Sequence, residues 1–501
     1  MIPSVTLHPR IAAHALCVAL LVSSRAYAAP VPEQCRLVPA PTVRAADALA
    51  RAVQALGIAE IGPRIRAGTM TDIISMDYQS DRPYPPYLWT NRQQRLLIAP
   101  AAGLVRLDLS MGAPGFAVLS DSARQVVVSP RGAQAVPQRT PNLLDERAMD
   151  AWTVLGDWQR ATDVRVLGRC VFRDAERVVL GRGAGVRMER LFLDPRTGVP
   201  VKLDRLEAHP LWGELRAEYL WQIWTPVTGV RALAPQYAFR MVEGEVNVQR
   251  LTERFALLPA DSAAALAFPA TIAPQRDAPA AMPDTVRVSP TTFLLRTPSY
   301  TNVVTLQRDT VFILDAQTDA ARAQGDSAWI GRLFPGRHPV VLVVTDLAWP
   351  HIGGVRNWVA QGATVVSHEQ SRAFLEKVTA RQWQLEPDAL TRARATRAVP
   401  LRFRGVSTET SRAAGGVRLV PIDGAGSEGA LMVYLGAERF LWTGDFVQPG
   451  ASESFSRVYA EEVVAAAARA ALTPERYAGM HVGLTDWARV PRWVVPTAPA
   501  R

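Results

Sequence analysis

Residues 345–354 read TDLAWPHIGG and lie between two segments of different character. The apolar run VVLVV precedes them, as in a buried β-strand, and VRNWVAQG follows with the spacing of a helix. The pair Gly353-Gly354 suits a tight turn from strand to helix, because glycine adopts backbone conformations that other residues avoid. Such turns often build functional sites. One histidine, His351, and one carboxylate, Asp346, make this a candidate metal-binding loop.

Strand-like and helix-like segments alternate on both sides of this loop, over residues 289–495. We expect a hairpin over NVVTLQRDTVFILDA, a helix at SAWIGRLF, a strand at ATVVSHE, a hairpin over LMVYLGAERFLWTGD and a helix at EEVVAAAARAAL. This mixed order predicts an α/β domain in which helices cover the sheets.

Several polar residues follow expected strands directly: Asp315, Asp346 with His351, Asp445, and His481. Ligand-binding groups gather at the carboxyl ends of strands in α/β sheets. Neutral imidazole and carboxylate are ligands of zinc. A lone histidine is more often packed or solvated than bound to a metal. Spacing alone therefore leaves a metal site and a structural role both open.

The order of these landmarks over about residues 295–490 resembles the metallo-β-lactamase fold. They are SYTNVV, VFILDA, the strand, loop and Gly-Gly turn at 340–360, ATVVSHE, GSEGALMVYLGAERFLWTGD and a final strand with its histidine. The resemblance implies an αββα sandwich.

The metal loop of that family is Thr-His-x-His-x-Asp-His-x-Gly-Gly. Here Asp346 replaces the first histidine, Ala348 the second and Pro350 the aspartate, so that only His351 remains. The family's mid-domain histidine aligns with Gly426. Its bridging aspartate and its last histidine match Asp445 and His481, respectively.

The resemblance implies a reduced, mononuclear zinc site. Its metal ligands would be His351, Asp445 and His481, with Asp346 as a substitute carboxylate that also serves catalysis. Such a site leaves a position open for water, which the metal makes acidic enough to act as the nucleophile of a hydrolase. The family's non-ligand histidine matches His368, which stays outside this set.

Pro350 stands where the family has a carboxylate that ligates metal and moves protons, and its loss argues against efficient hydrolysis. The alternative is a non-catalytic pseudo-hydrolase that acts as a periplasmic binding or scaffolding protein for a hydrophobic ligand. The substrate is not readable, because lactam, ester, thioester and phosphoester hydrolases share this fold.

Residues 29–256 have a different pattern: a helix over about 42–56, then short strands of an antiparallel sheet. The leading helix, the run of strands and the hairpin DPRTGVPVKL resemble the LolA/LolB-like half-barrels of exported lipid-handling proteins. The resemblance implies a concave face that holds an acyl chain or a hydrophobic peptide. Three tryptophans of these strands either line that face or belong to the core: Trp212, Trp221 and Trp224. An Ala- and Pro-rich linker is expected over 257–288.

The first 28 residues read as a secretory signal peptide, with a basic residue, an apolar run and cleavage after Ala28. A membrane anchor is the alternative, although the run is shorter than the ~20 residues of a spanning helix. No later segment is long and apolar enough to cross a membrane. We therefore expect a periplasmic or secreted protein.

The cysteines of the mature chain are Cys35 and Cys170. In an oxidising compartment they form a disulfide or remain as two buried thiols, and both readings stay open. Two cysteines are too few for a structural zinc site built on cysteine.

The net charge is +10, but it comes almost entirely from scattered arginines, since Lys202 and Lys377 are the only lysines. No basic helix or aromatic-plus-basic strand of a nucleic-acid binder is present in the sequence. A small-molecule or lipid-like ligand is the expected partner, and the sequence does not indicate an oligomeric state.

Overall fold

The computed structural model describes most of the chain after the leader. The predicted signal peptide, residues 1–28, lies outside the described residues. Among the described residues, no helix is both long and apolar enough to span a membrane. The described residues are 35–75, 89–100, 103–110, 116–121, 124–130, 132–136, 146–209, 211–242, 245–259, 261–262, 266–273, 284–297, 300–407, 411–412, 416–447 and 457–494.

The N-terminal half is built on one 13-stranded sheet, in which all neighbours pair antiparallel. This confirms the expected large antiparallel sheet. The order of its strands is β6-β5-β4-β3-β2-β1-β13-β12-β11-β10-β9-β8-β7. The strands are β1 Ile65–Ser75, β2 Trp89–Ala99, β3 Leu104–Ser110, β4 Phe116–Ser120, β5 Gln125–Ser129, β6 Gly132–Val136, β7 Arg165–Phe172, β8 Ala175–Arg182, β9 Glu189–Leu193, β10 Pro200–His209, β11 Gly213–Pro226, β12 Leu233–Val242 and β13 Glu245–Leu258.

Helices pack against one face of this sheet and form its main core. They are α2 Ala45–Ala55, α3 Ile58–Ile61, α4 Glu146–Met149 and α5 Ala151–Arg160. Trp158 of α5 and Trp221 of β11 are fully buried there, and the Trp221 indole donates to the Met149 carbonyl at 2.8 Å. Only the first helix was expected. The N-cap of α5 is Asp150, whose side chain accepts from the Thr153 amide at 2.8 Å.

A short segment pairs at one point with each outer strand of the large sheet. At one edge, Val38 exchanges two backbone hydrogen bonds with Arg169 of β7, each 2.8 Å long. A disulfide between Cys35 and Cys170 fixes that segment, with the Cα atoms 5.3 Å apart, which confirms the bridge. At the other edge, Ala273 pairs with β6 through two backbone hydrogen bonds.

The C-terminal half contains two further sheets, of seven and six strands. The first is ordered β14-β15-β16-β17-β18-β19-β20 and the second β21-β22-β23-β24-β25-β26. Their strands are β14 Asp284–Ser289, β15 Thr292–Arg296, β16 Thr301–Gln307, β17 Thr310–Leu314, β18 Val340–Val343, β19 Thr364–His368, β20 Arg402–Val406, β21 Ser411–Arg412, β22 Val417–Pro421, β23 Leu431–Leu435, β24 Phe440–Trp442, β25 Arg476–Gly479 and β26 Val482–Asp486.

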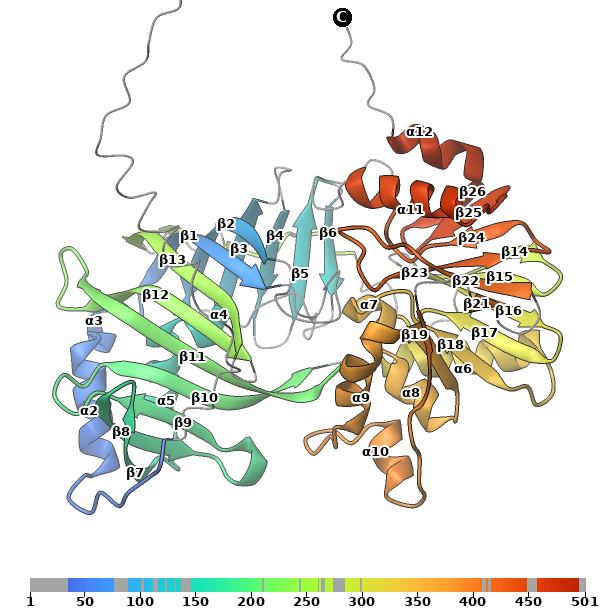
Figure 1. The fold of residues 1–501 in the computed structure, drawn as a ribbon. Coiled ribbons are helices and arrows are strands. Elements are labelled where there is room, and N and C mark those ends of the chain that lie inside the picture. The colour runs from blue at the N-terminus through green and yellow to red at the C-terminus, as the bar shows by residue number, and fades with distance from the viewer. Residues whose placement is uncertain are drawn as a thin grey trace, which may run out of the picture.

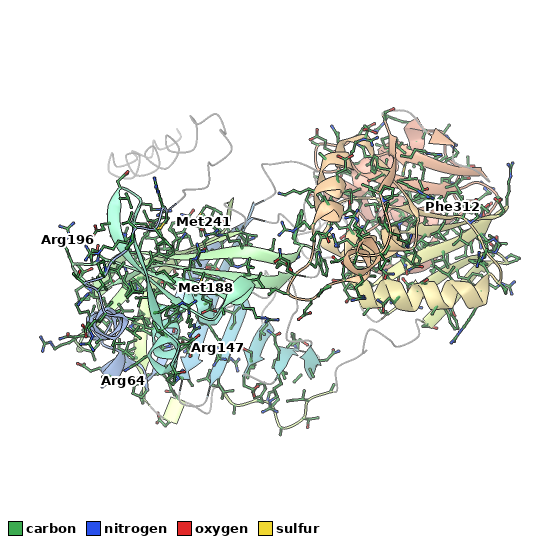
Figure 2. The ribbon with its side chains drawn as sticks, turned by 90° about the horizontal axis from the view of Figure 1, so that it is seen from below. Arg64, Arg147, Met188, Arg196, Met241 and Phe312 are labelled. Carbon is green, nitrogen blue, oxygen red and sulfur yellow. A yellow bond between two sulfur atoms is a disulfide. The ribbon has the colours of Figure 1, made fainter. Side chains whose placement is uncertain are left out.

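These two sheets share a core in which Phe312 and Leu314 of β17 meet Val433 of β23 and Trp442 of β24. Figure 2 places Phe312 among the C-terminal strands, apart from Met241 of the large sheet and from Met188, which directly precedes β9. Each sheet has a second core on its other side, where helices pack (Figure 1). The helices are α6 Ala320–Leu333, α8 Val355–Ala360, α9 Arg372–Ala380 and α10 Ala389–Arg394 on the first sheet, and α11 Arg457–Arg469 and α12 Val490–Val494 on the second.

The strands β17, β18, β19 and β20 run parallel, so their carboxyl ends meet at one edge. Asp315 follows β17 and Asp346 follows β18 at this edge. Two of the polar residues singled out in the sequence, Asp315 and Asp346, therefore lie together there, as ligand-binding groups do in parallel sheets.

Candidate metal centre

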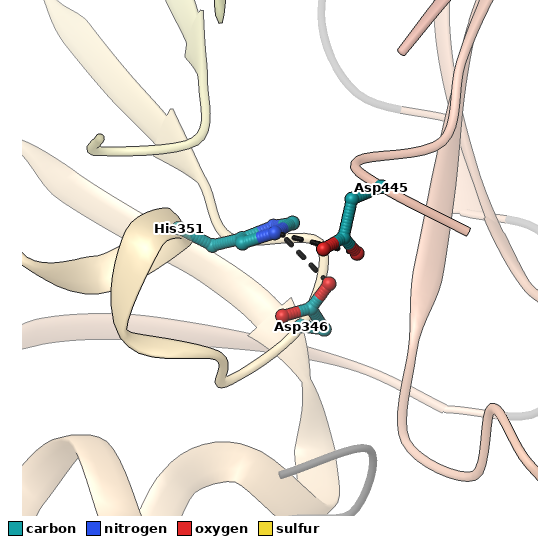
Figure 3. A group of neighbouring side chains, drawn as sticks. All are labelled: Asp346, His351 and Asp445. Atoms are coloured by element: carbon teal, nitrogen blue, oxygen red, sulfur yellow. Dashed lines mark ion pairs between the residues drawn. The ribbon is translucent and has the colours of Figure 1, made fainter. Parts of the chain in front are cut away.

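The candidate centre lies where the loop after β18 faces the turn after β24. Asp346 belongs to that loop, His351 to the short helix α7 Trp349–Ile352, and Asp445 to the turn of the other sheet. Figure 3 shows the three side chains pointing toward one another.

The three side chains offer one nitrogen and two carboxylate oxygens that lie within 4.8 Å of one another. His351 Nδ1 is 3.1 Å from Asp346 Oδ2, and His351 Nε2 is 3.5 Å from Asp445 Oδ1. The His351 side chain is fully buried, and the Asp346 side chain is 5% exposed. This donor set matches the ligands that zinc takes in proteins.

Two of these atoms lack the hydrogen bonds that buried polar atoms normally make. Within the described part of the chain, His351 Nε2 and Asp346 Oδ2 make no hydrogen bond of normal geometry, and each has only an ion-pair contact, to Asp445 at 3.5 Å and to His351 Nδ1 at 3.1 Å, respectively. The other oxygen, Asp346 Oδ1, accepts from the Ala348 amide at 2.7 Å and is thereby fixed. Because an unsatisfied buried polar atom costs free energy, a cation between these groups would relieve that cost.

Asp315 holds the histidine in place from behind. Its carboxylate accepts from the Thr345 amide at 2.8 Å, the Thr345 hydroxyl at 2.9 Å and the Trp442 indole at 2.9 Å. It lies 3.6 Å from His351 Nδ1, and the Thr345 hydroxyl lies 3.3 Å from the same atom. The backbone of Asp315 is left-handed, with φ 68°, which a non-glycine residue adopts only when its surroundings require it. Asp315 is thus a positioning residue that the predicted ligand set leaves out.

Close backbone approach explains two of the glycines around the centre. A Cβ atom on Gly444 would lie 2.6 Å from the Thr345 hydroxyl and 2.9 Å from His351 Cε1, and the φ of Gly444 is +60°. A Cβ on Gly354 would lie 2.3 Å from the Ala316 carbonyl, to which the Gly354 amide donates. Neither position accepts a side chain without moving the loop that carries His351.

Negative charge is in excess around His351. Burial alone lowers the pKa of His351, but the carboxylates of Asp346, Asp445 and Asp315 raise it well above its ordinary value. Burial raises the pKa of Asp346, and Asp445 and Asp315 add to that effect while His351 opposes it. For Asp445, His351 and His481 outweigh the effect of burial and leave its pKa lowered. Three carboxylates facing one imidazole form a pocket that attracts a cation.

His481 lies at the margin of this group. It is exposed in the turn after β25, and its ring centroid is 5.2 Å from that of Tyr300. It is close enough to Asp445 to lower the pKa of that carboxyl, but it is not one of the three residues whose ligand atoms converge. Gly426 is the position that aligned with the mid-domain histidine of the metallo-β-lactamase pattern. It offers no side-chain ligand, and its amide donates to Glu462 at 3.0 Å.

The comparisons with known proteins find similar solved structures but no match to a protein-family model or to a curated protein. The similar solved structures include a metallo-β-lactamase from Pontibacter korlensis, which is 14% identical to this chain with a TM-score of 0.33. The match covers 42% of this chain and 97% of that chain.

Two further solved structures extend this picture. A metallo-β-lactamase from Pseudomonas aeruginosa in its mono-zinc form has 12% identity and a TM-score of 0.34, covering 44% of this chain and 95% of its own. A LolA superfamily protein from Nitrosomonas europaea has 15% identity and a TM-score of 0.31, covering 44% of this chain and 97% of its own. These are the two families named from the sequence. Likeness of this degree carries no conclusion about activity.

Proposed function

We propose that this chain is an exported hydrolase whose C-terminal part is an αββα sandwich holding one metal ion. The ion would bind to Asp346, His351 and Asp445. The observation that carries the proposal is the convergence of three ligand atoms within 4.8 Å of one another, of which His351 Nε2 and Asp346 Oδ2 are buried and make no hydrogen bond of normal geometry. Polar atoms of this kind rarely stay unsatisfied in a folded protein.

The donor set of one imidazole and two carboxylates suits Zn²⁺. When bound, such an ion acidifies water and polarises a carbonyl or phosphoryl oxygen. Asp315 and Thr345 fix the orientation of the His351 ring. The amide of Ala348 fixes Asp346 Oδ1, so that Oδ2 faces the centre, and we assign proton transfer to this carboxyl. The rings of Tyr300 and His481 contact each other, and both residues lie close enough to Asp445 to interact with its charge.

The same proposal divides the chain into parts. Residues 1–28 would be the cleaved leader to the periplasm or medium, 29–256 the sheet domain, 257–288 the linker and 289–495 the hydrolase-like domain. One core cluster holds only residues of the N-terminal half, and another holds only residues of the C-terminal half, which supports this division. A third cluster joins Leu211, Trp212, Leu215 and Val242 of the N-terminal half to the C-terminal helices. The strand β14 begins at Asp284 and pairs with β15, so the second domain would take in the end of the linker.

Metal content tests the proposed function directly. The full chain, stripped with a chelator and dialysed, should take up about one Zn²⁺ per molecule. At a free zinc concentration 100-fold above Kd, binding should raise the free energy of unfolding by about 2.7 kcal/mol, because the ion binds only the folded protein. A chain that takes up no zinc and is not stabilised would be the non-catalytic binding or scaffolding protein.

A second candidate function is binding of a hydrophobic ligand by the large sheet. The supporting observation is a cavity of about 50 Å³, lined by Met70, Leu96, Trp152 and Phe255 among others. That volume fits the end of one alkyl chain. Arg66 also lines the cavity; one of its nitrogens donates to Asp150 at 2.6 Å, and its Nε and Nη1 have no hydrogen-bond partner among the described residues. An apolar chain that carries a hydrogen-bond acceptor would satisfy both features.

A cavity-filling substitution tests this second function. Ala238 is buried and lines the cavity, so Ala238→Leu should place new methyl groups in the space a ligand would use. We expect at least a tenfold loss of affinity for a fluorescent fatty acid, which corresponds to about 1.4 kcal/mol. Ala184→Leu, at an exposed position, is the matched control. Equal binding by both variants would remove the cavity from consideration.

A further inference from the structure

The tip of the β10–β11 hairpin leaves the large sheet and reaches the helices of the C-terminal half (Figure 1). Leu211 and Trp212 at this tip are buried in the same core cluster as α8 and α9. The ring of Trp212 meets that of Phe374 of α9 edge to face, with centroids 5.2 Å apart. The hairpin tip is therefore a docking element between the two halves of the molecule.

Polar contacts fix the docked tip. Arg381, which follows α9, donates to the Trp212 carbonyl at 3.0 Å and also to the Glu214 carbonyl. The Glu214 carboxylate accepts from the Gln384 amide at 2.6 Å and from the Leu385 amide at 3.3 Å. All of these contacts join residues more than 160 positions apart in the chain.

His209 shapes the tip from inside. Its Nδ1 accepts from the amides of Leu211 at 3.1 Å and Trp212 at 3.2 Å. An imidazolium carries a proton on both nitrogens and accepts no hydrogen bond, so the docked tip requires a neutral His209. The His209 side chain is buried, which further disfavours a charge.

Charged groups from three sides face this histidine. Arg240 of β12 and Arg381 repel a proton on the ring, and Glu207 of its own strand attracts one. Around the neighbouring Trp212 lie Glu214 of β11 and Lys377 of α9, whose ammonium nitrogen is 5.4 Å from the Trp212 ring centroid. Burial first, and then Arg240 and Arg381, lower the pKa of His209 to about 3.

We propose that the β10–β11 tip is an acid-releasable latch between the large sheet and the helices of the C-terminal half. In the docked state His209 accepts two amide hydrogen bonds and excludes a proton. Once the tip is released, His209 meets water and binds a proton at its ordinary pKa. The latch residues and the three residues of the candidate metal centre are different groups, so the latch goes beyond the proposed function and does not depend on it.

The size of the effect follows from linkage. The pKa of His209 is lower in the docked state than in the released state, so docking is fully favoured above the ordinary pKa of 6.5 and weakens as pH falls from 6.5 toward 3. Between pH 8 and pH 5 the ratio of released to docked molecules should rise about 30-fold.

Hydrogen exchange of the full chain tests the latch. Amides in peptides covering 211–214 and 384–385 should lose about 30-fold in protection between pH 8 and pH 5, after correction for the intrinsic effect of pH on exchange. A peptide from β13 in the same experiment reports on global opening. Equal protection of the tip at both pH values would overturn the proposal.

Hydrogen exchange of two variants distinguishes acid release of the hairpin tip through His209 from a general loss of stability at low pH. His209→Asn keeps a side-chain acceptor for the amides two and three residues on, as in an Asx turn, but does not titrate. Its tip should keep the same protection at pH 8 and pH 5. His338→Asn, at a half-buried histidine outside the tip, should keep the wild-type pH dependence. If His209→Asn does not fold, a wild-type tip that loses protection no faster than β13 still decides against the latch.

Discussion

His351→Ala should abolish metal binding at the candidate centre while the fold persists. His351 supplies the only nitrogen of the three convergent ligands, and its ring lies between Asp346 and Asp445. Without it, two carboxylates would face each other across a small space. We expect zinc affinity to fall by roughly 100-fold or more, since even removal of a residue that merely supports a ligand costs 10- to 100-fold. Zinc titration with metal analysis measures this directly.

Two comparisons keep the His351→Ala result interpretable. His338→Ala removes a half-buried histidine outside the candidate centre and should bind zinc as the wild type does. Circular dichroism of both variants should match the wild type, because the sheets on either side are held by their own cores. If His351→Ala still takes up one zinc ion, the ion binds elsewhere and the proposed centre is wrong.

Removal of the disulfide should cost about 5 kcal/mol of the free energy of unfolding of the large sheet. The bridge joins Cys35 to Cys170 across a sequence separation of 135 residues, and a closed loop of that length strongly restricts the unfolded chain. The Cys35→Ala, Cys170→Ala variant should show the loss in urea unfolding, with a larger m-value because the unfolded chain without the bridge is less compact.

The wild type under reducing conditions is the matched control for that variant. Its unfolding midpoint should shift by nearly the same amount, and reductant should not shift the variant any further. A loss below about 1 kcal/mol would mean that the reduced, unfolded chain is already restricted in this region by residual structure.

Sequence pattern predicted the strands of the large sheet better than its helices. Alternation of apolar and polar residues marks a half-buried strand whatever its partners are. Helix α5 was missed because Thr153, Val154 and Gly156 are poor helix formers. Packing of Trp152 and Trp158 against the sheet stabilises the helix nonetheless, and Asp150 at its N-cap was the available signal.

The three convergent residues of the candidate centre were among those named from the sequence. Asp346 and His351 share one loop, and the spacing of that loop already suggests a common site. Asp445 comes from the second sheet, so its approach depended on the family resemblance. The roles of Asp315 and His481 were harder to predict. Asp315 has a left-handed backbone, and His481 lies in an exposed turn. The residue type alone does not specify either backbone conformation.

Trp212 illustrates a contact that pattern does not predict. Its position beside a strand placed it either in the core of its own sheet or on a ligand-binding face. In the structure it packs with Phe374 in the core of the other half, while Trp221 is part of its own sheet's core. A contact of this kind depends on how the folded large sheet docks against the folded C-terminal half, and the local sequence pattern carries no information about that docking.

The segments that pair with the outer strands of the large sheet affect how readily the protein associates with other copies of itself at high concentration. An uncovered outer strand is a template on which a second chain can add its own strand. Val38, tethered by Cys35, occupies one position of that template on β7, and Ala273 occupies one on β6. In a reducing medium the tether on β7 is lost, so light scattering should reveal concentration-dependent association of reduced chains. A chain that folds in the cytoplasm would therefore be more prone to aggregate than one that folds after export.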